Sequence, residues 1–330
     1  MRTAALLLTA ALAVSGCADP SAAPGGGLKI TFLPKQVNNP YFTVAQKGGE
    51  RAAKELNAEF KATGPSDASA SSQVTYINTA AQQRQSAIVL AANDENAVAP
   101  ALKSARAAGM KVVSFDSDVV KDARDVFVNQ ASAAEIAATQ IKLLSTALGG
   151  SGEFAILSAT ANATNQNAWI ALMRKELEKP EHAGLKLVEV VYGNDDDQMS
   201  FQKTQGLLQA HVNLKGIVAP TAVGLAAAAR YLSSSSYKGN VTLTGLGTPN
   251  QMKAYVTDGT VKSFALWDPG KLGELAVRAA VALVSGQIKG AEGDKFKAGE
   301  LGEYTVGANG EIVLGPPTVF TSDNIGQFDF

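Results

Sequence analysis

The chain has 330 residues, of which 46% are hydrophobic and 18% charged, and its formal net charge is -1. This length and composition predict a globular protein of about two domains. The nearly neutral charge gives no electrostatic reason to expect a nucleic acid or an anionic membrane surface as partner.

The amino terminus has the pattern of an export signal. Arg2 precedes the apolar run AALLLTAALAV, which is too short to span a bilayer, and VSGC follows it. VSGC resembles the lipobox of bacterial lipoproteins, so we expect residues 1–16 to be a signal peptide and Cys17 to be lipidated; an unlipidated exported protein is the alternative. Cys17 is the only cysteine, which excludes an internal disulfide. Residues 17–27 are expected to form a lipid-anchored flexible linker that holds the protein to the outer face of the cytoplasmic membrane or in the periplasm.

From Leu28 onward, short β-rich runs alternate with helical patterns such as residues 42–60 and 270–286. This alternation predicts an α/β protein whose parallel sheets are covered by helices on both faces. The runs that predict strands are 28–33, 73–78, 87–92, 111–116, 153–159, 185–192, 216–220, 241–246 and 261–267.

So many strands favour two doubly wound lobes over one sheet. We expect the first lobe to comprise residues 28–130 plus about 264–300, and the second lobe 131–263 plus about 301–330. The helix after Trp267-Asp268-Pro269 would return to the first lobe, and a hairpin is expected around residues 308–310. Several crossings between the lobes would leave a cleft between them.

Ligands of open parallel sheets bind beyond the carboxyl ends of the strands. The segments that follow the predicted strands carry amides, acids, hydroxyls and aromatic rings, with a single lysine. A sugar site needs carboxylates and amides for the ring hydroxyls and aromatic side chains for the C–H faces. The polar candidates are Lys35, Asn39, Asp116, Asn165 and Gln166, and the aromatic candidates are Tyr41, Phe42, Trp169 and Trp267.

Some of these residues have a structural alternative. Asn38 or Asn39 is expected to cap the helix that begins at Pro40, and the other asparagine to reach the ligand. Tyr41 and Phe42 could pack at the start of that helix instead. Trp169 suits the core as well as the cleft.

Enzyme motifs are absent from the sequence. No G-x-G-x-x-G follows a strand, and neither a Walker A motif nor G-x-S-x-G occurs. His182 and His211 stand where helices are expected to end, and the triplet at 195–197 stands where a helix is expected to start, so we predict dipole and capping roles for them instead of metal binding. Asp116 and Asp118 lack a companion nucleophile, and Asp118 is interpreted as a turn residue. No catalysis, cofactor or metal is expected.

Taken together, these segments resemble the bacterial periplasmic sugar-binding proteins of ABC importers with the ribose-binding type of fold. The resemblance is greatest to the rhamnose-binding proteins, which are related to the autoinducer-2 receptors. It implies the type I periplasmic binding protein fold and ligand contacts at Lys35, Asp116, Asn165, Gln166, Pro220 and Ala222, with Asn39, Tyr41, Phe42 and Trp267 lining the cleft. It extends over FLPKQVNNPYF, VVSFDSD, VFVNQAS, NATNQNAW, VVYGNDDDQ, APTAVGLAAAARYL, TGLGTPNQM, ALWDP, GEYTVG and NIGQFDF.

Asn165 and Thr221 stand where the autoinducer-2 receptors have aspartates, so the resemblance favours L-rhamnose as ligand. The expected protein is a monomeric, exported lipoprotein that closes two lobes on a monosaccharide and delivers it to an ABC permease. Autoinducer-2 or another pentose or hexose is an alternative ligand. A sugar-sensing receptor for a membrane signalling protein and a secreted sugar-modifying enzyme are alternative functions.

Overall fold

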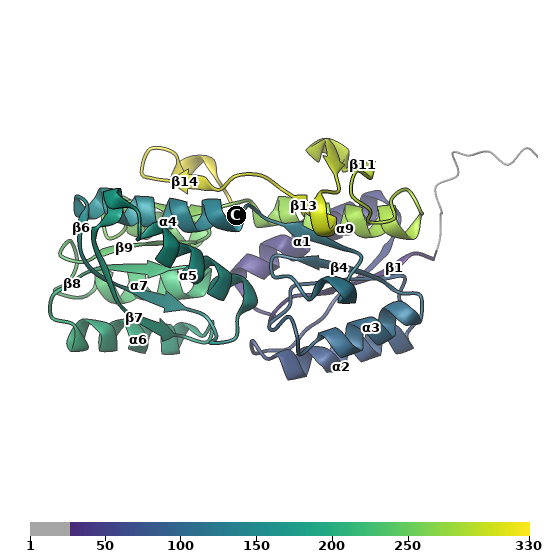
Figure 1. Cartoon of the computed structure of the whole chain (residues 1–330), viewed down its shortest axis with the longest axis horizontal. Helices are drawn as coiled ribbons and strands as arrows, with labels where there is room; N and C mark the ends of the chain where they lie inside the picture. The colour runs from purple at the N-terminus through teal and green to yellow at the C-terminus, as the bar shows by residue number, and fades with distance from the viewer. Residues whose placement is uncertain (1–26) are drawn as a thin grey trace, which may run out of the picture.

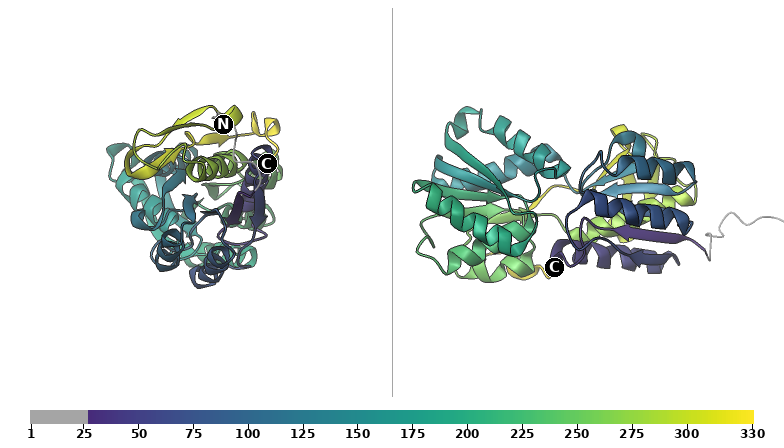
Figure 2. Two further views of the ribbon diagram at one scale, coloured as in Figure 1. Left: turned by 90° about the vertical axis from the view of Figure 1, so that its right-hand side faces the viewer. Right: turned by 90° about the horizontal axis from the view of Figure 1, so that it is seen from below.

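Two α/β lobes lie side by side along the long axis of the molecule (Figure 1). The computed structural model describes residues 27–330, so the predicted signal peptide, Cys17 and most of the predicted linker lie outside the described residues. Seen from below, the lobes are joined by segments of extended chain (Figure 2). The prediction of two α/β lobes is confirmed.

The first lobe is built on a six-stranded parallel sheet with the order β13-β5-β4-β3-β1-β2. Helices α1 (Pro40–Glu55) and α9 (Pro269–Val284) pack together on one face, and α2 (Ala70–Gln82) and α3 (Ala99–Ala107) on the other. Successive strand residues point to opposite faces, so Phe32 packs with α1 and α9 while Leu33 packs with α2 and α3. The strands are β1 (Lys29–Leu33), β2 (Glu59–Ala62), β3 (Ala87–Leu90), β4 (Lys111–Phe115), β5 (Val126–Asn129) and β13 (Glu311–Val313).

The second lobe has a four-stranded parallel sheet with the order β7-β6-β8-β9. Its strand β10 (Phe264–Leu266) joins β9 through a bridge between Leu246 and Ala265, and it pairs antiparallel with β14 (Thr318–Phe320). The remaining elements are β6 (Ser151–Ser158), β7 (Gly184–Tyr192), β8 (Leu214–Ala219), β9 (Thr242–Gly245), α4 (Ala133–Leu148), α5 (Thr164–Glu176), α6 (Asp197–Ala210), α7 (Ala222–Ser233) and α8 (Pro249–Thr257).

Both sheets have the same winding. In each sheet, the second strand along the chain lies on one side of the first strand, and the third and fourth strands lie on the other side of the first strand. The direction of winding therefore reverses beside the first strand. In such sheets ligands bind beyond the carboxyl ends of the strands near this reversal. The chain passes between the lobes after β5, β10 and β13, and these crossings bring the two carboxyl edges toward each other.

In the first lobe, one predicted strand was wrong and one strand was missed. Residues 73–78 are β-branched enough to suggest a strand, but they lie in α2. A helix forms because the buried residues recur at helical spacing, namely Ala70, Gln73, Ile77 and Ala80. In addition, Ser69 caps the first turn. Strand β2 was missed because its burial alternates weakly at the sheet edge and it follows directly on the helical pattern of α1.

The carboxyl-terminal region also departs from expectation. No hairpin forms at residues 308–310, which make a 3-10 turn with Asn309 at φ 60. Two strands earlier in this region, β11 (Lys295–Lys297) and β12 (Glu303–Thr305), form an antiparallel pair instead. Because β13 pairs with β5 and β10 with β14, residues 311–313 lie in the first sheet and 264–266 beside the second, whereas the predicted boundaries had them the other way round.

The predicted return of the helix after residues 267–269 is confirmed. Helix α9 packs along α1 and covers β3, β4 and β5.

Within residues 27–330, no helix has both the length and the apolar character that a membrane crossing needs.

Candidate ligand-binding site

The carboxyl ends of the two sheets enclose a cavity between the lobes, with about 40 Å³ of free space. All of the residues predicted to bind ligand line this cavity, together with three that were not predicted. The predicted residues are Lys35, Asn39, Tyr41, Phe42, Asp116, Asn165, Gln166, Trp169, Pro220, Thr221, Ala222 and Trp267; the additional ones are Asp195, Leu246 and Leu266.

Asn39 both caps α1 and reaches into the cleft. Its Oδ1 accepts a hydrogen bond from the backbone amide of Tyr41 at 3.0 Å, and its Nδ2 donates to Oδ2 of Asp195 at 3.4 Å. Asn38 is exposed and has φ 64, outside the helix. Asn39 therefore caps the helix and also lines the cavity, whereas Asn38 does neither.

A hydrogen-bond chain connects aromatic residues to an acid on the first lobe's side of the cavity. The hydroxyl of Tyr41 donates to Oδ1 of Asp116 at 2.8 Å and accepts from Nε1 of Trp267 at 2.7 Å. Trp169 packs edge-on against Trp267 with ring centroids 6.1 Å apart. Phe42 packs against Tyr41 and against the core residue Phe115, so it has a structural role as well as a place in the cavity wall.

Side chains of the two lobes bond directly across the cleft. Nζ of Lys35 donates to Oδ1 of Asn165 at 2.8 Å, and Nδ2 of Asn165 lies 3.4 Å from Oδ2 of Asp116. Nε2 of Gln36 donates to the backbone oxygen of Asp195 at 3.1 Å. These contacts require the lobes to be closed.

Gln166 plays a different part from Asn165. Its Oε1 accepts from the hydroxyl of Ser158 at 2.7 Å and from the backbone amide of Ala159 at 2.8 Å. The carboxamide oxygen therefore ties the start of α5 to the end of β6, within the second lobe.

Asp195 is the cavity residue that matters most among those the sequence analysis missed. Asp196, its neighbour, caps α6 by accepting from the backbone amide of Met199 at 2.7 Å, as the triplet was predicted to do. Asp195 has φ 53, and this left-handed conformation accompanies its entry into the cleft, where the hydroxyl of Thr221 donates to it. The signal was available: Asp195 follows the predicted strand 185–192, whose carboxyl end was not considered as part of the cleft.

Burial shifts the pKa values of four side chains in the cavity. It raises the pKa of Asp116 and of Asp195, and the nearby ammonium of Lys35 opposes the rise in both. Burial also lowers the pKa of Lys35, against the pull of these carboxylates, and raises the pKa of Tyr41 well above its usual value. One cation thus lies with two buried acids, an arrangement suited to a ligand rich in hydroxyl donors.

The model of the periplasmic binding protein domain matches residues 30–288. The chain belongs to this family. This periplasmic binding protein is 55% identical to a sugar ABC transporter from Actinomyces odontolyticus, over 92% of this chain and 97% of that chain, with a TM-score of 0.74.

Two further solved structures resemble this periplasmic binding protein and contain ligands. An ABC transporter solute binding protein from Clostridium phytofermentas with bound L-rhamnose is 36% identical, over 92% of this chain and 98% of that chain, with a TM-score of 0.89. LsrB from Clostridium saccharobutylicum in complex with AI-2 is 29% identical, over 92% of this chain and 100% of that chain, with a TM-score of 0.86. The Clostridium phytofermentas relative is a solute binding protein, and the family of this chain is one of binding proteins and not of enzymes.

Asp118 of this periplasmic binding protein belongs to the scaffold and not to the cavity. It accepts hydrogen bonds from Nε of Arg124 at 2.6 Å and from Nη2 of the same residue at 2.8 Å. Nη1 of Arg124 donates to the backbone oxygen of Asn309 at 2.9 Å. Asp116, two residues earlier, has φ 61 and faces the cavity. The two acids are therefore close in sequence but differ in role.

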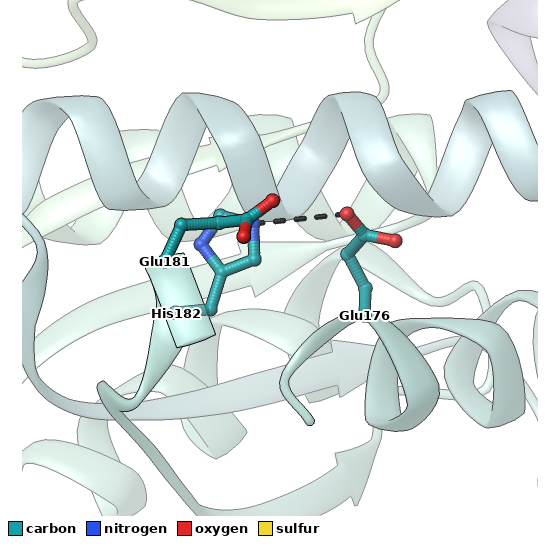
Figure 3. Close-up of side chains that lie close together, drawn as sticks. All are labelled: Glu176, Glu181 and His182. Atoms are coloured by element: carbon teal, nitrogen blue, oxygen red, sulfur yellow. Dashed lines mark ion pairs between the residues drawn. The ribbon is translucent and has the colours of Figure 1, made fainter. Parts of the chain in front are cut away.

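A second cluster of titratable groups lies at the far end of α5 (Figure 3). Nε2 of His182 is 3.7 Å from Oε1 of Glu176, and Glu181 lies beside them. Nζ of Lys179 already pairs with the same Glu176 oxygen at 2.7 Å. We interpret the cluster as an ion-pair network around the end of the helix, in line with the dipole role predicted for His182.

Proposed function

We propose that this protein is the exported substrate-binding protein of an ABC sugar importer and that its ligand is L-rhamnose. The observation that carries this proposal is the cavity itself: acids, amides and aromatic rings from both lobes converge on one buried space. The L-rhamnose-bound relative supports the ligand, with 36% identity and a TM-score of 0.89. In this proposal the protein acts as a monomer, anchored through Cys17, and transfers the sugar to a membrane permease.

Binding would work by hinge closure, the behaviour for which periplasmic binding proteins are a standard example. A ligand shifts the lobes toward the closed form only through contacts that differ between the open and closed forms. Direct bonds between the lobes, such as that from Lys35 to Asn165, join groups that line the closed cavity, so a sugar would replace them. Its hydroxyls would then connect the same groups.

The arrangement of the lobes supports this interpretation. The two ligand-bound relatives have TM-scores of 0.89 and 0.86, whereas the 55% identical relative has 0.74. The order of these TM-scores is the reverse of the order of sequence identity, and the fold resembles the two ligand-bound structures more than it resembles the 55% identical one. The direct bonds across the cleft agree with a closed form.

Autoinducer-2 is the second candidate ligand, and Asp195 favours it. The absence of acids at Asn165 and Thr221 counted against autoinducer-2, but Asp195 hydrogen-bonds to Thr221 and brings a second carboxylate into the cleft. A relative in complex with AI-2 is 29% identical. Both candidates therefore belong in the test.

Calorimetric titration with L-rhamnose, autoinducer-2, D-ribose and D-galactose tests the proposal. We expect L-rhamnose to bind with a dissociation constant of about a micromolar or less, which corresponds to about -8 kcal/mol. Tighter binding of autoinducer-2 would reject the ligand, and failure of all four to bind would reject the sugar-binding function. Turnover of a sugar by the purified protein would contradict a binding role.

The affinity should fall at mildly acidic pH. Burial raises the pKa of Asp116 and Asp195, so both carboxylates gain protons above the ordinary aspartate value of about 3.9 and stop acting as charged acceptors. Because both pKa values are raised, the affinity is retained at pH values above them and is lost as the pH falls through them. Calorimetry at several pH values from 7 downward measures this.

The variant Asp195→Asn serves as the control for this pH dependence. Asp195 contributes to the raised pKa of Asp116, after burial, so its neutralisation should move the remaining loss of affinity to lower pH. Asparagine tolerates the left-handed backbone found at this position. Affinity that stays constant down to pH 4 in the unmodified protein would contradict the assignment of the acids as ligand acceptors.

The anchoring is tested by Cys17→Ser in the full-length chain. We expect the unmodified protein to sediment with membranes and the variant to be released in soluble form, because a serine cannot accept the thioether-linked lipid. Equal distribution of the two proteins would argue for an exported protein without a lipid anchor.

A further inference from the structure

We propose that Leu246, Leu266 and Pro220 form a methyl niche that selects 6-deoxy sugars over their 6-hydroxy counterparts. This inference rests on the proposed function, because it assigns part of the same cavity. Neither leucine was among the residues predicted from sequence, and both line the cavity with almost no exposure, 3% for Leu246 and 1% for Leu266.

The niche is held together by strand pairing. Leu246 directly follows β9 and Leu266 ends β10, and the bridge between Leu246 and Ala265 places these strand ends side by side. The backbone amide of Leu246 donates to the oxygen of Ala219 at 2.9 Å, which puts the neighbouring Pro220 against the same corner. Three residues from three strand ends therefore form one wall.

The side chains of this wall are those of two leucines and a proline, so none of them offers a hydrogen bond to a ligand. The amide of Leu246 is already bonded to the oxygen of Ala219. Among the described residues, the polar side chains of the cavity bond to one another instead: Lys35 to Asn165, and Thr221 to Asp195. The cavity thus has a hydrogen-bonding side and an apolar corner.

The chemistry of the corner predicts what it accepts. A methyl group gains by burial against leucine and proline, and one buried carbon is worth about 10- to 200-fold in affinity in such pockets. A hydroxymethyl group would lose water without finding a partner, which costs up to about a hundredfold. A sugar that places C6 in this corner should therefore be bound best as the 6-deoxy form.

Three sugars with the same ring stereochemistry test the niche: L-lyxose has no C6, L-rhamnose has a methyl group, and L-mannose has a hydroxymethyl group. In calorimetric titrations of the unmodified protein, we expect L-rhamnose to bind at least about tenfold more tightly than either of the others. Affinities within threefold of one another would overturn the niche while leaving sugar binding intact. If none of the three sugars binds, the proposed function fails, and the niche with it.

Two variants test whether Leu246 is responsible for the preference for L-rhamnose over L-mannose. Leu246→Asn supplies a partner for the 6-hydroxyl and keeps the branching at Cγ, and Leu246→Ala opens the corner to water if the asparagine variant does not fold. Either should bring the ratio of L-rhamnose to L-mannose affinity close to one. The matched control is Leu243→Ala, which removes the same group from β9 at a buried position outside the cavity. An unchanged ratio in the Leu246 variants, or an equal change in the Leu243 variant, would overturn the proposal.

Discussion

Replacing Asp116 by asparagine should weaken L-rhamnose binding by about a hundredfold. A hydrogen bond to a charged acceptor contributes about 1.5–3 kcal/mol, and a hundredfold loss corresponds to about 2.7 kcal/mol. The carboxylate of Asp116 is buried, accepts from Tyr41 and supplies part of the negative charge opposite Lys35. Asparagine keeps the volume and accepts the φ of 61, so the expected loss comes from the charge and not from the fold.

Asp118→Asn is the control for this experiment. Asp118 pairs with Arg124 outside the cavity, and the Arg124 side chain is only 5% exposed. We expect this variant to lower the free energy of unfolding by about 1–3 kcal/mol and to leave the affinity unchanged. Calorimetry and thermal melting of the ligand-free proteins separate the two effects. If Asp116→Asn retained full affinity, or lost it only together with the fold, Asp116 would be a structural residue.

The contrast between Asp116 and Asp195 shows how far the sequence could predict the site. The rule that ligands lie beyond strand ends brought Lys35, Asp116 and Asn165 together from positions far apart in the chain, and the structure places them in hydrogen-bond contact. Asp195 obeys the same rule but sits beside a genuine capping residue, Asp196, so one acidic triplet contains two roles. Only the left-handed backbone at Asp195 separates them, and local sequence does not determine that conformation.

Leu246 and Leu266 were missed for a different reason. A leucine at the end of a buried strand has the same local pattern whether it completes the core or faces a ligand. The difference depends on the bridge between Leu246 and Ala265, a contact between segments that the predicted boundaries had assigned to different lobes. Apolar parts of a site are therefore harder to predict than its acids and amides.

The errors in the predicted lobe boundaries have the same origin. The alternation of strands and helices was enough to predict two parallel sheets, because each strand and its following helix are local in sequence. Strand β13 pairs with β5 across more than half of the chain, and β10 pairs with β14 although α9, β11, β12 and β13 lie between them in the sequence. Such pairings depend on how the lobes assemble, which short-range patterns do not encode.

Replacing Gly48 by alanine should lower the free energy of unfolding by about 3 kcal/mol or more. A Cβ at this position would overlap the backbone carbonyl of Gly270, and a Cβ at Gly273 would overlap that of Ala45 in return. Helices α1 and α9 therefore touch backbone to backbone, and neither can yield by a rotamer change. With an unfolding entropy of about 2.1 cal/mol/K per residue, 3 kcal/mol corresponds to a fall in melting temperature of about 4 °C in a chain of 330 residues.

Gly206→Ala is the matched substitution. Gly206 lies within α6, is exposed, and has no atom within 4 Å of the position of a Cβ, so alanine should stabilise the helix by about 0.5–1 kcal/mol. Opposite shifts in melting temperature for the same chemical change would establish that the contact between the helices, and not helix propensity, decides the result. A loss below 1 kcal/mol for Gly48→Ala would mean that the helices can separate freely.

The close contact between α1 and α9 also bears on the ligand. Asn39 and Tyr41 stand at the start of α1, and Trp267 lies two residues before α9. The spacing of the two helices therefore fixes the bond from Trp267 to Tyr41 and hence the position of the Asp116 carboxylate. We therefore expect folded Gly48→Ala protein to bind L-rhamnose more weakly than the Gly206→Ala control. Unchanged affinity in the folded variant would show that the cavity adjusts independently of the helix pair.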